Sequence, residues 1–421
     1  MRPSAKVGML RSRSIVIILA IMWIVLVSAG PLYCTAAAGQ SATDIPSTFF
    51  GMTLINKSDW PQDSIGALGK GTLVNWSYSE PQRGVFNWAN LDAWVETAEN
   101  HGVDFFFSNN LVPPWAAADQ TTCGPTYSGS NVIGCTSTVA NIQDWDDFVT
   151  ALATRYKGKM IYELWNEPNA TSFTGTIADM VTLTTHEYNI IRSIDPGALI
   201  LAPSPTWGTV SPSTYMDQYF GAGGPTGVDV ITFHAYWPTP EGIINVINNI
   251  QAVMAKYGLS SKPLWDTEGS WNLSLTTDQQ IGFVARYYLS QWSMGVSRFY
   301  WYAWDDPDWG TLWDPTNGSN PAAIAYQQVY NWMVGAKLSA PCAANGTVWT
   351  CGLSRPNGAQ ALAVWNTAAP SSFSAPAQYT RYQDLVGATH SVSGPATIGP
   401  QPVLFTSGLP LPPTNLKATV K

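Results

Sequence analysis

The chain has 421 residues, of which 45% are hydrophobic and only 11% are charged. This length suits one barrel-sized domain with a smaller companion, or two to three ordinary domains, and the composition suits a sizeable core. The formal net charge of −8 argues against nucleic acid or an anionic membrane surface as a partner, because both would repel an acidic protein.

The first 38 residues have the features of a secretory signal peptide. A basic head precedes the apolar run 15–27, which is too short to cross a bilayer comfortably. The small residues 36–38 then offer a cleavage site. We therefore predict export, with residues 1–38 removed and no membrane contact beyond this leader. An uncleaved anchor, or a lipoprotein that uses Cys34, is the alternative.

The five cysteines support export. Cleavage after residue 38 would remove Cys34 and leave four cysteines, which fall into two local pairs, Cys123 with Cys135 and Cys342 with Cys351. Each pair would close one short loop in an oxidising compartment. Local pairing is one of three possible connectivities, and it is the one that we predict.

Residues 39–335 alternate apolar runs with helical patterns after a short polar segment. Parallel strands that are buried on both faces are expected to be almost wholly apolar, as these runs are. The predicted strands are 49–54, 71–76, 104–108, 160–165, 198–202, 228–234, 263–267 and 298–303. The predicted helices are 90–101, 144–156, 177–194, 242–257 and 277–294. Eight such repeats predict an α/β fold of the (β/α)8 TIM-barrel type.

The pattern changes at residue 336. Helical periodicity stops, and short runs separated by Gly, Pro and Ser turns predict a small antiparallel β-sandwich over residues 336–408. Its expected strands are 347–353, 361–367, 379–384, 389–393 and 402–405. Residues 409–421 are interpreted as a stiff linker and tail, which either begins a further module or ends the chain raggedly.

Two glutamates carry the functional argument. Glu167 lies in the run 162–169, and Glu268 lies in the run 264–271. They follow the predicted fourth and seventh strands, so both point to the barrel face where such enzymes place their chemistry. Their sequence neighbours are Trp, Asn and Tyr rather than cations, which favours a chemical role over a buried ion pair.

Such a pair of carboxylates suits the cleavage of glycosides. Retention of anomeric configuration needs a nucleophile and an acid/base group about 5–5.5 Å apart. The nucleophile must stay ionised, whereas the acid must hold its proton, so the two need different surroundings. The chain also has 20 Trp and 18 Tyr, more than core packing needs, and flat aromatic faces stack on sugar rings.

The run Trp165-Asn166-Glu167-Pro168, together with Glu268, resembles clan A of the retaining glycoside hydrolases. The order of motifs is most similar to family 39, or to the neighbouring family 5. The resemblance implies that Glu167 is the acid/base, that Glu268 is the nucleophile and that Asn166 bonds the 2-hydroxyl of the sugar. It also implies a β-linkage or an α-L equivalent.

The resemblance extends to other motifs. In Phe233-His234-Ala235-Tyr236 it implies that His234 and Tyr236 line the site, with Tyr236 bonded to the nucleophile. It implies that Trp301 and Trp304 form an aromatic floor. The run 80–88 and Pro113-Pro114-Trp115 are also shared with this group.

One departure concerns the second strand. Many clan members carry an Arg near its end that supports the nucleophile, but the run 74–78 here holds none. Either another donor takes that role or the subsite differs.

Three further residues are weaker candidates for substrate contacts. Asn110 ends the predicted third strand and could bind a sugar hydroxyl, although capping of a loop explains it equally well. Trp115 and Trp76 could be sugar platforms, although core packing explains them equally well.

The sequence thus predicts a secreted, monomeric, retaining glycoside hydrolase that acts on a poly- or oligosaccharide by double displacement. We expect carbohydrate to be its partner and no cofactor or metal, because the four His have no metal-ligand spacing. One alternative is a transglycosylase that uses the same residues. Another is a carbohydrate-binding protein that has lost catalysis.

Overall fold

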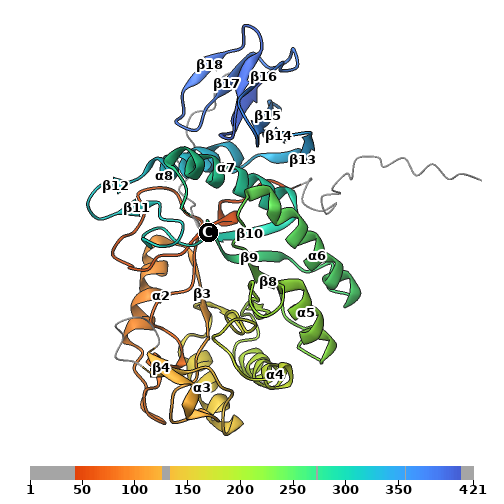
Figure 1. The fold of residues 1–421 in the computed structure, drawn as a ribbon. Coiled ribbons are helices and arrows are strands. Elements are labelled where there is room, and N and C mark those ends of the chain that lie inside the picture. The colour runs from red at the N-terminus through yellow and green to blue at the C-terminus, as the bar shows by residue number, and fades with distance from the viewer. Residues whose placement is uncertain (1–42, 126–132, 272–273, 356, 409–421) are drawn as a thin grey trace, which may run out of the picture. The chain divides into compact units, whose positions relative to one another are not determined.

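The computed structural model describes residues 43–125, 133–271, 274–355 and 357–408, which belong to one compact unit (Figure 1). The predicted signal peptide, Cys34 and the predicted tail 409–421 lie outside the described residues. Among the helices that are described, none is both long enough and apolar enough to span a membrane.

Eight parallel strands form the central sheet, in the order β7-β6-β3-β2-β1-β10-β9-β8. A parallel bridge between Leu201 and Val230 joins the two ends, so the sheet closes on itself. The predicted barrel is therefore confirmed. Its strands are β1 (Phe50–Met52), β2 (Ala67–Leu68), β3 (Asp104–Ser108), β6 (Ile161–Glu163), β7 (Ile200–Leu201), β8 (Ile231–His234), β9 (Leu264–Gly269) and β10 (Val296–Trp301).

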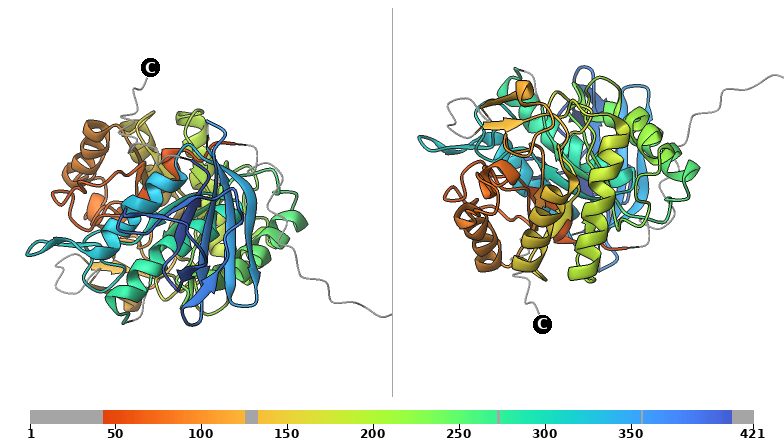
Figure 2. Two further views of the ribbon diagram at one scale, coloured as in Figure 1. Left: turned by 90° about the horizontal axis from the view of Figure 1, so that it is seen from above. Right: turned by 90° about the horizontal axis from the view of Figure 1, so that it is seen from below.

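Helices surround this sheet (Figure 2). They are α1 (Trp76–Ser79), α2 (Ala89–His101), α3 (Ile142–Arg155), α4 (Ile177–Ile194), α5 (Pro212–Gly221), α6 (Ile243–Lys256), α7 (Thr277–Ser293) and α8 (Pro321–Met333). The sequence pattern missed α5 and α8, which both begin with Pro. In α8 the side chain of Asn320 accepts hydrogen bonds from the amides of Ala322 and Ala323, so an Asn-Pro pair that resembles a turn is a helix start.

The second strand lies earlier than predicted. The run 71–76 is not a strand; β2 is the pair Ala67–Leu68, and Trp76 begins α1. Glycines on both sides of β2 obscured the pattern, and they are needed for close packing. A Cβ at Gly66 would lie 1.8 Å from the Ser47 carbonyl oxygen. This correction places Lys70 at the mouth of the barrel.

Antiparallel strands follow the barrel, as predicted. A six-stranded sheet has the order β13-β14-β15-β20-β17-β18, and β16 pairs with β19. Phe405 of the large sheet and Ile398 of the small one share a buried cluster. The strands are β13 (Lys337–Asn345), β14 (Val348–Ser354), β15 (Gln360–Asn366), β16 (Ser371–Phe373), β17 (Arg381–Gln383), β18 (Thr389–Ser391), β19 (Ala396–Ile398) and β20 (Val403–Thr406). The domain boundary at 335 stays a prediction.

Both predicted disulfides are present. Cys123 and Cys135 join the short strands β4 (Cys123–Pro125) and β5 (Ile133–Cys135), after a 3-10 turn η2 (Gln120–Thr122). Cys342 and Cys351 join β13 to β14. The remaining elements are the 3-10 turns η1 (Ser47–Phe49) and η3 (Pro240–Gly242) and the hairpin of β11 (Trp313–Asp314) with β12 (Gly318–Ser319).

One buried ion pair connects the barrel to the C-terminal sheet. Glu241 in η3 accepts two hydrogen bonds from Arg286 of α7, at 2.7 and 2.6 Å. The indole N–H of Trp365 in β15 also donates to Glu241, at 2.7 Å. The side chains of Glu241 and Arg286 are each only 11% exposed. A buried guanidinium without its partner is costly, so this contact should matter for stability.

Replacing Glu241 with Ala should lower the free energy of unfolding by about 3 kcal/mol, because it leaves Arg286 buried without a counter-charge. Thermal or urea unfolding measures this. Asp217→Ala is the matched control, since it breaks a solvent-exposed pair with Lys256 and should change little. Equal stability of the two variants would contradict the assigned role of Glu241.

Candidate active site

The fold brings Glu167 and Glu268 together. Glu167 follows β6 and Glu268 lies in β9, so both stand at the C-terminal ends of barrel strands. A carboxylate oxygen of each and a ring nitrogen of His234 all lie within 4.8 Å of one another. This spacing suits a retaining pair, for which about 5–5.5 Å is usual.

Glu268 accepts hydrogen bonds on both carboxylate oxygens. The hydroxyl of Tyr236 donates to Oε1 at 2.5 Å, and the Lys70 ammonium bonds Oε2. Glu268 is only 7% exposed. A strong donor on each oxygen stabilises a negative charge on this carboxylate, as a nucleophile requires.

Lys70 is the main site residue that the sequence analysis missed. Its ammonium also bonds the side-chain oxygen of Asn166, and its side chain is 20% exposed. Burial alone would lower the pKa of Lys70, but the charges of Glu268, Glu167 and Glu163 outweigh it and raise the pKa. Lys70 therefore stays cationic. Lys70 lies two residues beyond β2. It supplies the donor to Glu268 for which the sequence offered no Arg near the second strand.

Glu167 has a different set of partners. His234 Nδ1 lies 2.9 Å from Glu167 Oε1 and 3.7 Å from Glu268 Oε2, and His234 is fully buried at the end of β8. Burial raises the pKa of Glu167, but the hydrogen bond and charge of His234 and the charge of Lys70 outweigh it, so the pKa is lowered overall. The backbone of Glu167 is left-handed, with φ at 50°, a strained state that often marks functional sites.

A third glutamate lies beneath the pair. Glu163 at the end of β6 is fully buried and accepts hydrogen bonds from three hydroxyls: Ser108 at 2.9 Å, Ser204 at 2.8 Å and Thr267 at 2.7 Å. Burial raises the pKa of this carboxyl. The donors come from β3, from the end of β7 and from β9, so Glu163 ties together the strands that position Glu167 and Glu268.

A pocket of about 320 Å³ opens over the two carboxylates. Trp207 and Trp309 lie in its wall and are 47% and 39% exposed, which is unusual for Trp. The remaining lining residues are Ala170, Thr206, Tyr236 and Tyr302. Exposed aromatic faces beside acids suit the stacking of sugar rings. Sequence reasoning missed both Trp residues because they lie in loops after β7 and β10 and match no motif.

The two Trp residues that were predicted to form an aromatic floor do not line the pocket. Trp301 and Trp304 are 0% and 1% exposed and pack in the core, where no sugar can reach their rings. The indole of Trp301 donates to the Gly310 carbonyl at 2.7 Å. Tyr302, which lies between them in the chain, lines the pocket instead.

Three weaker candidates also lie away from the pocket wall. Trp76 is fully buried and donates to the Glu80 carboxylate at 2.7 Å. Trp115 donates to the Glu80 carbonyl at 3.0 Å and lines a separate groove. Asn110 accepts a hydrogen bond from Asn75 at 2.8 Å. Each of these three residues therefore has a structural partner, and a role in core packing or in a loop explains its presence.

The group Glu167, His234 and Glu268 is close enough to hold a metal ion, judged on the described residues. However, both oxygens of Glu268 already accept hydrogen bonds, and one of these donors is the Lys70 ammonium, which would repel a cation. The donor set suits acid–base chemistry between carboxylates better than metal coordination.

Comparison with known proteins agrees with this geometry. The family model for cellulase (glycosyl hydrolase family 5) matches residues 114–305. None of the curated proteins compared with the chain matches it.

Solved structures share the fold. A family 39 glycoside hydrolase from Bacteroides cellulosilyticus WH2 has a TM-score of 0.65 at 15% identity, over 86% of this chain and 80% of that chain. A monomeric beta-xylosidase from Caulobacter crescentus CB15 has a TM-score of 0.60 at 14% identity, over 87% and 97%. A GH51 arabinofuranosidase from Xanthomonas axonopodis pv. citri has a TM-score of 0.59 at 10% identity, over 86% and 97%.

At these identities the structural likeness establishes the barrel fold and no more. Together with the family model, it confirms the resemblance to the clan A glycoside hydrolases that the motifs predicted.

Proposed function

We propose that the protein is a secreted retaining glycoside hydrolase that cleaves a poly- or oligosaccharide by double displacement. The observation that carries this proposal is the pair of carboxylates within 4.8 Å of each other at the ends of β6 and β9. Their partners differ: Glu268 has two strong donors, whereas Glu167 contacts His234, and this contact lowers the pKa of Glu167.

In the first step Glu268 attacks the anomeric carbon. The bond from that carbon to the leaving oxygen breaks, and the leaving oxygen takes the proton of Glu167. Tyr236 and Lys70 hold the Glu268 carboxylate in place for attack. The product of this step is a sugar esterified to Glu268.

In the second step Glu167, now a carboxylate, takes a proton from water. The water oxygen attacks the anomeric carbon and the ester bond to Glu268 breaks, which restores both side chains. Two inversions leave the anomeric configuration unchanged.

The pocket favours an uncharged sugar. Trp207 and Trp309 offer apolar faces, and the chain is strongly acidic, which disfavours a polyanion. Matched structures are described as a beta-xylosidase and an arabinofuranosidase, so β-xylosides and α-L-arabinofuranosides are the first substrates to test. The family 5 match adds β-glucans. Two disulfides fit an extracellular protein, and we propose that it acts as a monomer.

The test is the stereochemistry of the first product. Aryl β-xyloside, β-glucoside and α-L-arabinofuranoside are hydrolysed and the earliest anomer is recorded by proton NMR. We expect retention, and we expect Glu268→Gln to abolish turnover. Glu167→Gln should retain activity only toward aryl groups that leave without a proton. An inverted first product would overturn the mechanism, and a product that carries an acceptor sugar would indicate a transglycosylase.

Replacing Lys70 with Met should lower kcat/KM about a hundredfold, because the nucleophile loses a partner that fixes its position. Lys70→Arg should recover part of the loss. Lys57→Met is the matched control: it removes a cation from a nearby loop, where Lys57 bonds Asn90 at 3.2 Å. If both Met variants keep wild-type activity, Lys70 does not position the nucleophile.

The pH profile tests the contact of His234 with Glu167. Glu167 must be protonated in the first step, so the alkaline limb of kcat/KM follows its pKa. His234→Leu removes a hydrogen bond that lowers this pKa, and the limb should move to higher pH. In His234→Asn an amide nitrogen can take the place of Nδ1, and the limb should move less. An unmoved limb in the Leu variant would contradict the assignment.

A further inference from the structure

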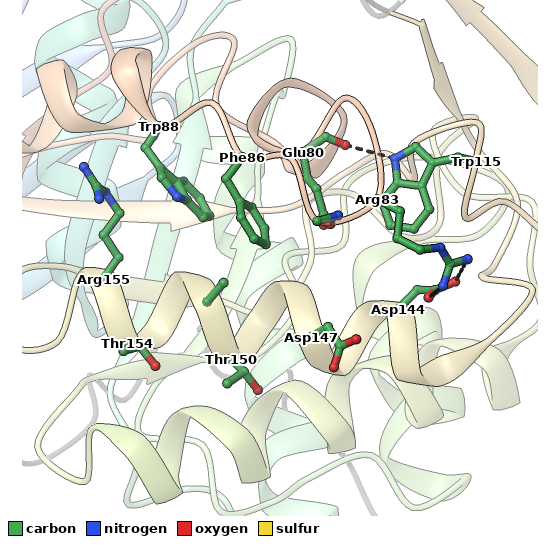
Figure 3. A pocket seen from close by; sticks show the side chains of 12 residues that line it. Glu80, Arg83, Phe86, Trp88, Trp115, Asp144, Asp147, Thr150, Thr154 and Arg155 are labelled. Carbon is green, nitrogen blue, oxygen red and sulfur yellow. Dashed lines mark hydrogen bonds and ion pairs between the residues drawn. The ribbon is translucent and has the colours of Figure 1, made fainter.

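A second groove lies on the outer wall of the barrel, outside the catalytic pocket. Its volume is about 640 Å³, and it runs between the segment 80–88 and helix α3 (Figure 3). Phe86 and Trp88 extend toward the helix from one side, and Asp147, Thr150 and Thr154 lie on the other (Figure 3). The catalytic mechanism does not use this groove.

A stack of aromatic rings ends in the groove. The rings of Phe86 and Trp88 are 5.1 Å apart and nearly parallel, at 10°. The ring centroids of Trp88 and Phe148 are 6.1 Å apart, with an angle of 20° between the ring planes. The ring centroids of Phe148 and Trp76 are 5.3 Å apart, with an angle of 23°. Trp76 is fully buried, whereas Phe86 is 36% exposed. Phe86 therefore lies at the open end of a ring stack that begins in the core, which suits a platform for binding.

The charges that line the groove already have partners. Arg83 bonds both oxygens of Asp144, which is buried. Arg155 bonds Asp92 at 3.0 and 2.6 Å. Asp147 accepts a hydrogen bond from Gln143 at 2.8 Å. Among the described lining residues, both guanidinium groups are thus neutralised, so nothing in the groove selects an anion.

The remaining chemistry suits a sugar. Arg83 is 61% exposed despite its ion pair, so it can still donate to a hydroxyl, and Thr150 and Thr154 add hydroxyl groups along the helix. An aromatic face packs against the apolar face of a sugar ring while such polar groups bond its edge.

We propose that this groove binds a neutral glycan chain, as a carbohydrate site separate from the catalytic pocket. The inference rests on the proposed function in one respect, since the glycan would be the polysaccharide substrate. The site would hold the enzyme on a long chain and would not affect cleavage of a small glycoside.

Native affinity electrophoresis tests the proposal. The full chain carrying Glu268→Gln, which cannot turn substrate over, is run in gels that contain soluble xylan or hydroxyethyl cellulose. Phe86→Ala should weaken retention roughly three- to tenfold, because it removes one stacking contact. Thr150→Met should also weaken it, since the longer side chain covers the space before Phe86. Ile324→Ala, at an exposed position of α8 that is 48% exposed, is the control and should bind normally.

The outcomes separate this proposal from the catalytic one. Without Glu268→Gln, Phe86→Ala should hydrolyse an aryl glycoside at the wild-type rate. If neither glycan retains the protein, or if Phe86→Ala and Thr150→Met both bind as tightly as Ile324→Ala, the groove is not a glycan site. If retention depends on Phe86 but no glycoside is cleaved, the groove proposal stands and the hydrolase proposal fails.

Discussion

The arrangement of the site depends on one ammonium group placed among three carboxylates. Lys70 bonds Glu268, and the charges of Glu167 and Glu163 also act on it. Ionised carboxylates this close repel one another. The cation offsets that repulsion and, through Asn166, also fixes the segment that carries Glu167. Lys70 therefore holds Glu268 directly and the segment of Glu167 through Asn166.

The sequence predicted the parts of the site that end regular strands. Glu167, Glu268, His234 and Tyr236 follow apolar runs long enough to recognise, and the structure brings them together. Lys70 was not predicted because the strand before it has only two residues. The glycines that flank this strand are needed because they pack closely against other segments of the chain. Contacts of that kind cannot be seen in a local pattern.

The aromatic residues that line the pocket also could not be identified from a local sequence pattern. The surplus of Trp suggested sugar platforms, but sequence could not say which rings face solvent. Trp301 and Trp304 flank Tyr302, and only Tyr302 reaches the pocket. Trp207 and Trp309 are exposed because their loops, which have no periodic pattern, turn them outward. The direction of a side chain at a strand end depends on tertiary packing, which residue type does not encode.

In the mechanism that we propose, the shared cation also helps Glu167 to serve first as acid and then as base. In that mechanism Lys70 is bonded to Glu268 before reaction, and a negative charge on the attacking carboxylate opposes loss of the proton from Glu167. Once Glu268 is esterified its charge is gone, and the field of Lys70 is no longer offset by its closest partner. The cation and His234 then favour the ionised form of Glu167, which is the form that must take a proton from water. In the proposed mechanism, the loss and return of the charge on Glu268 would thus help to switch Glu167 between acid and base.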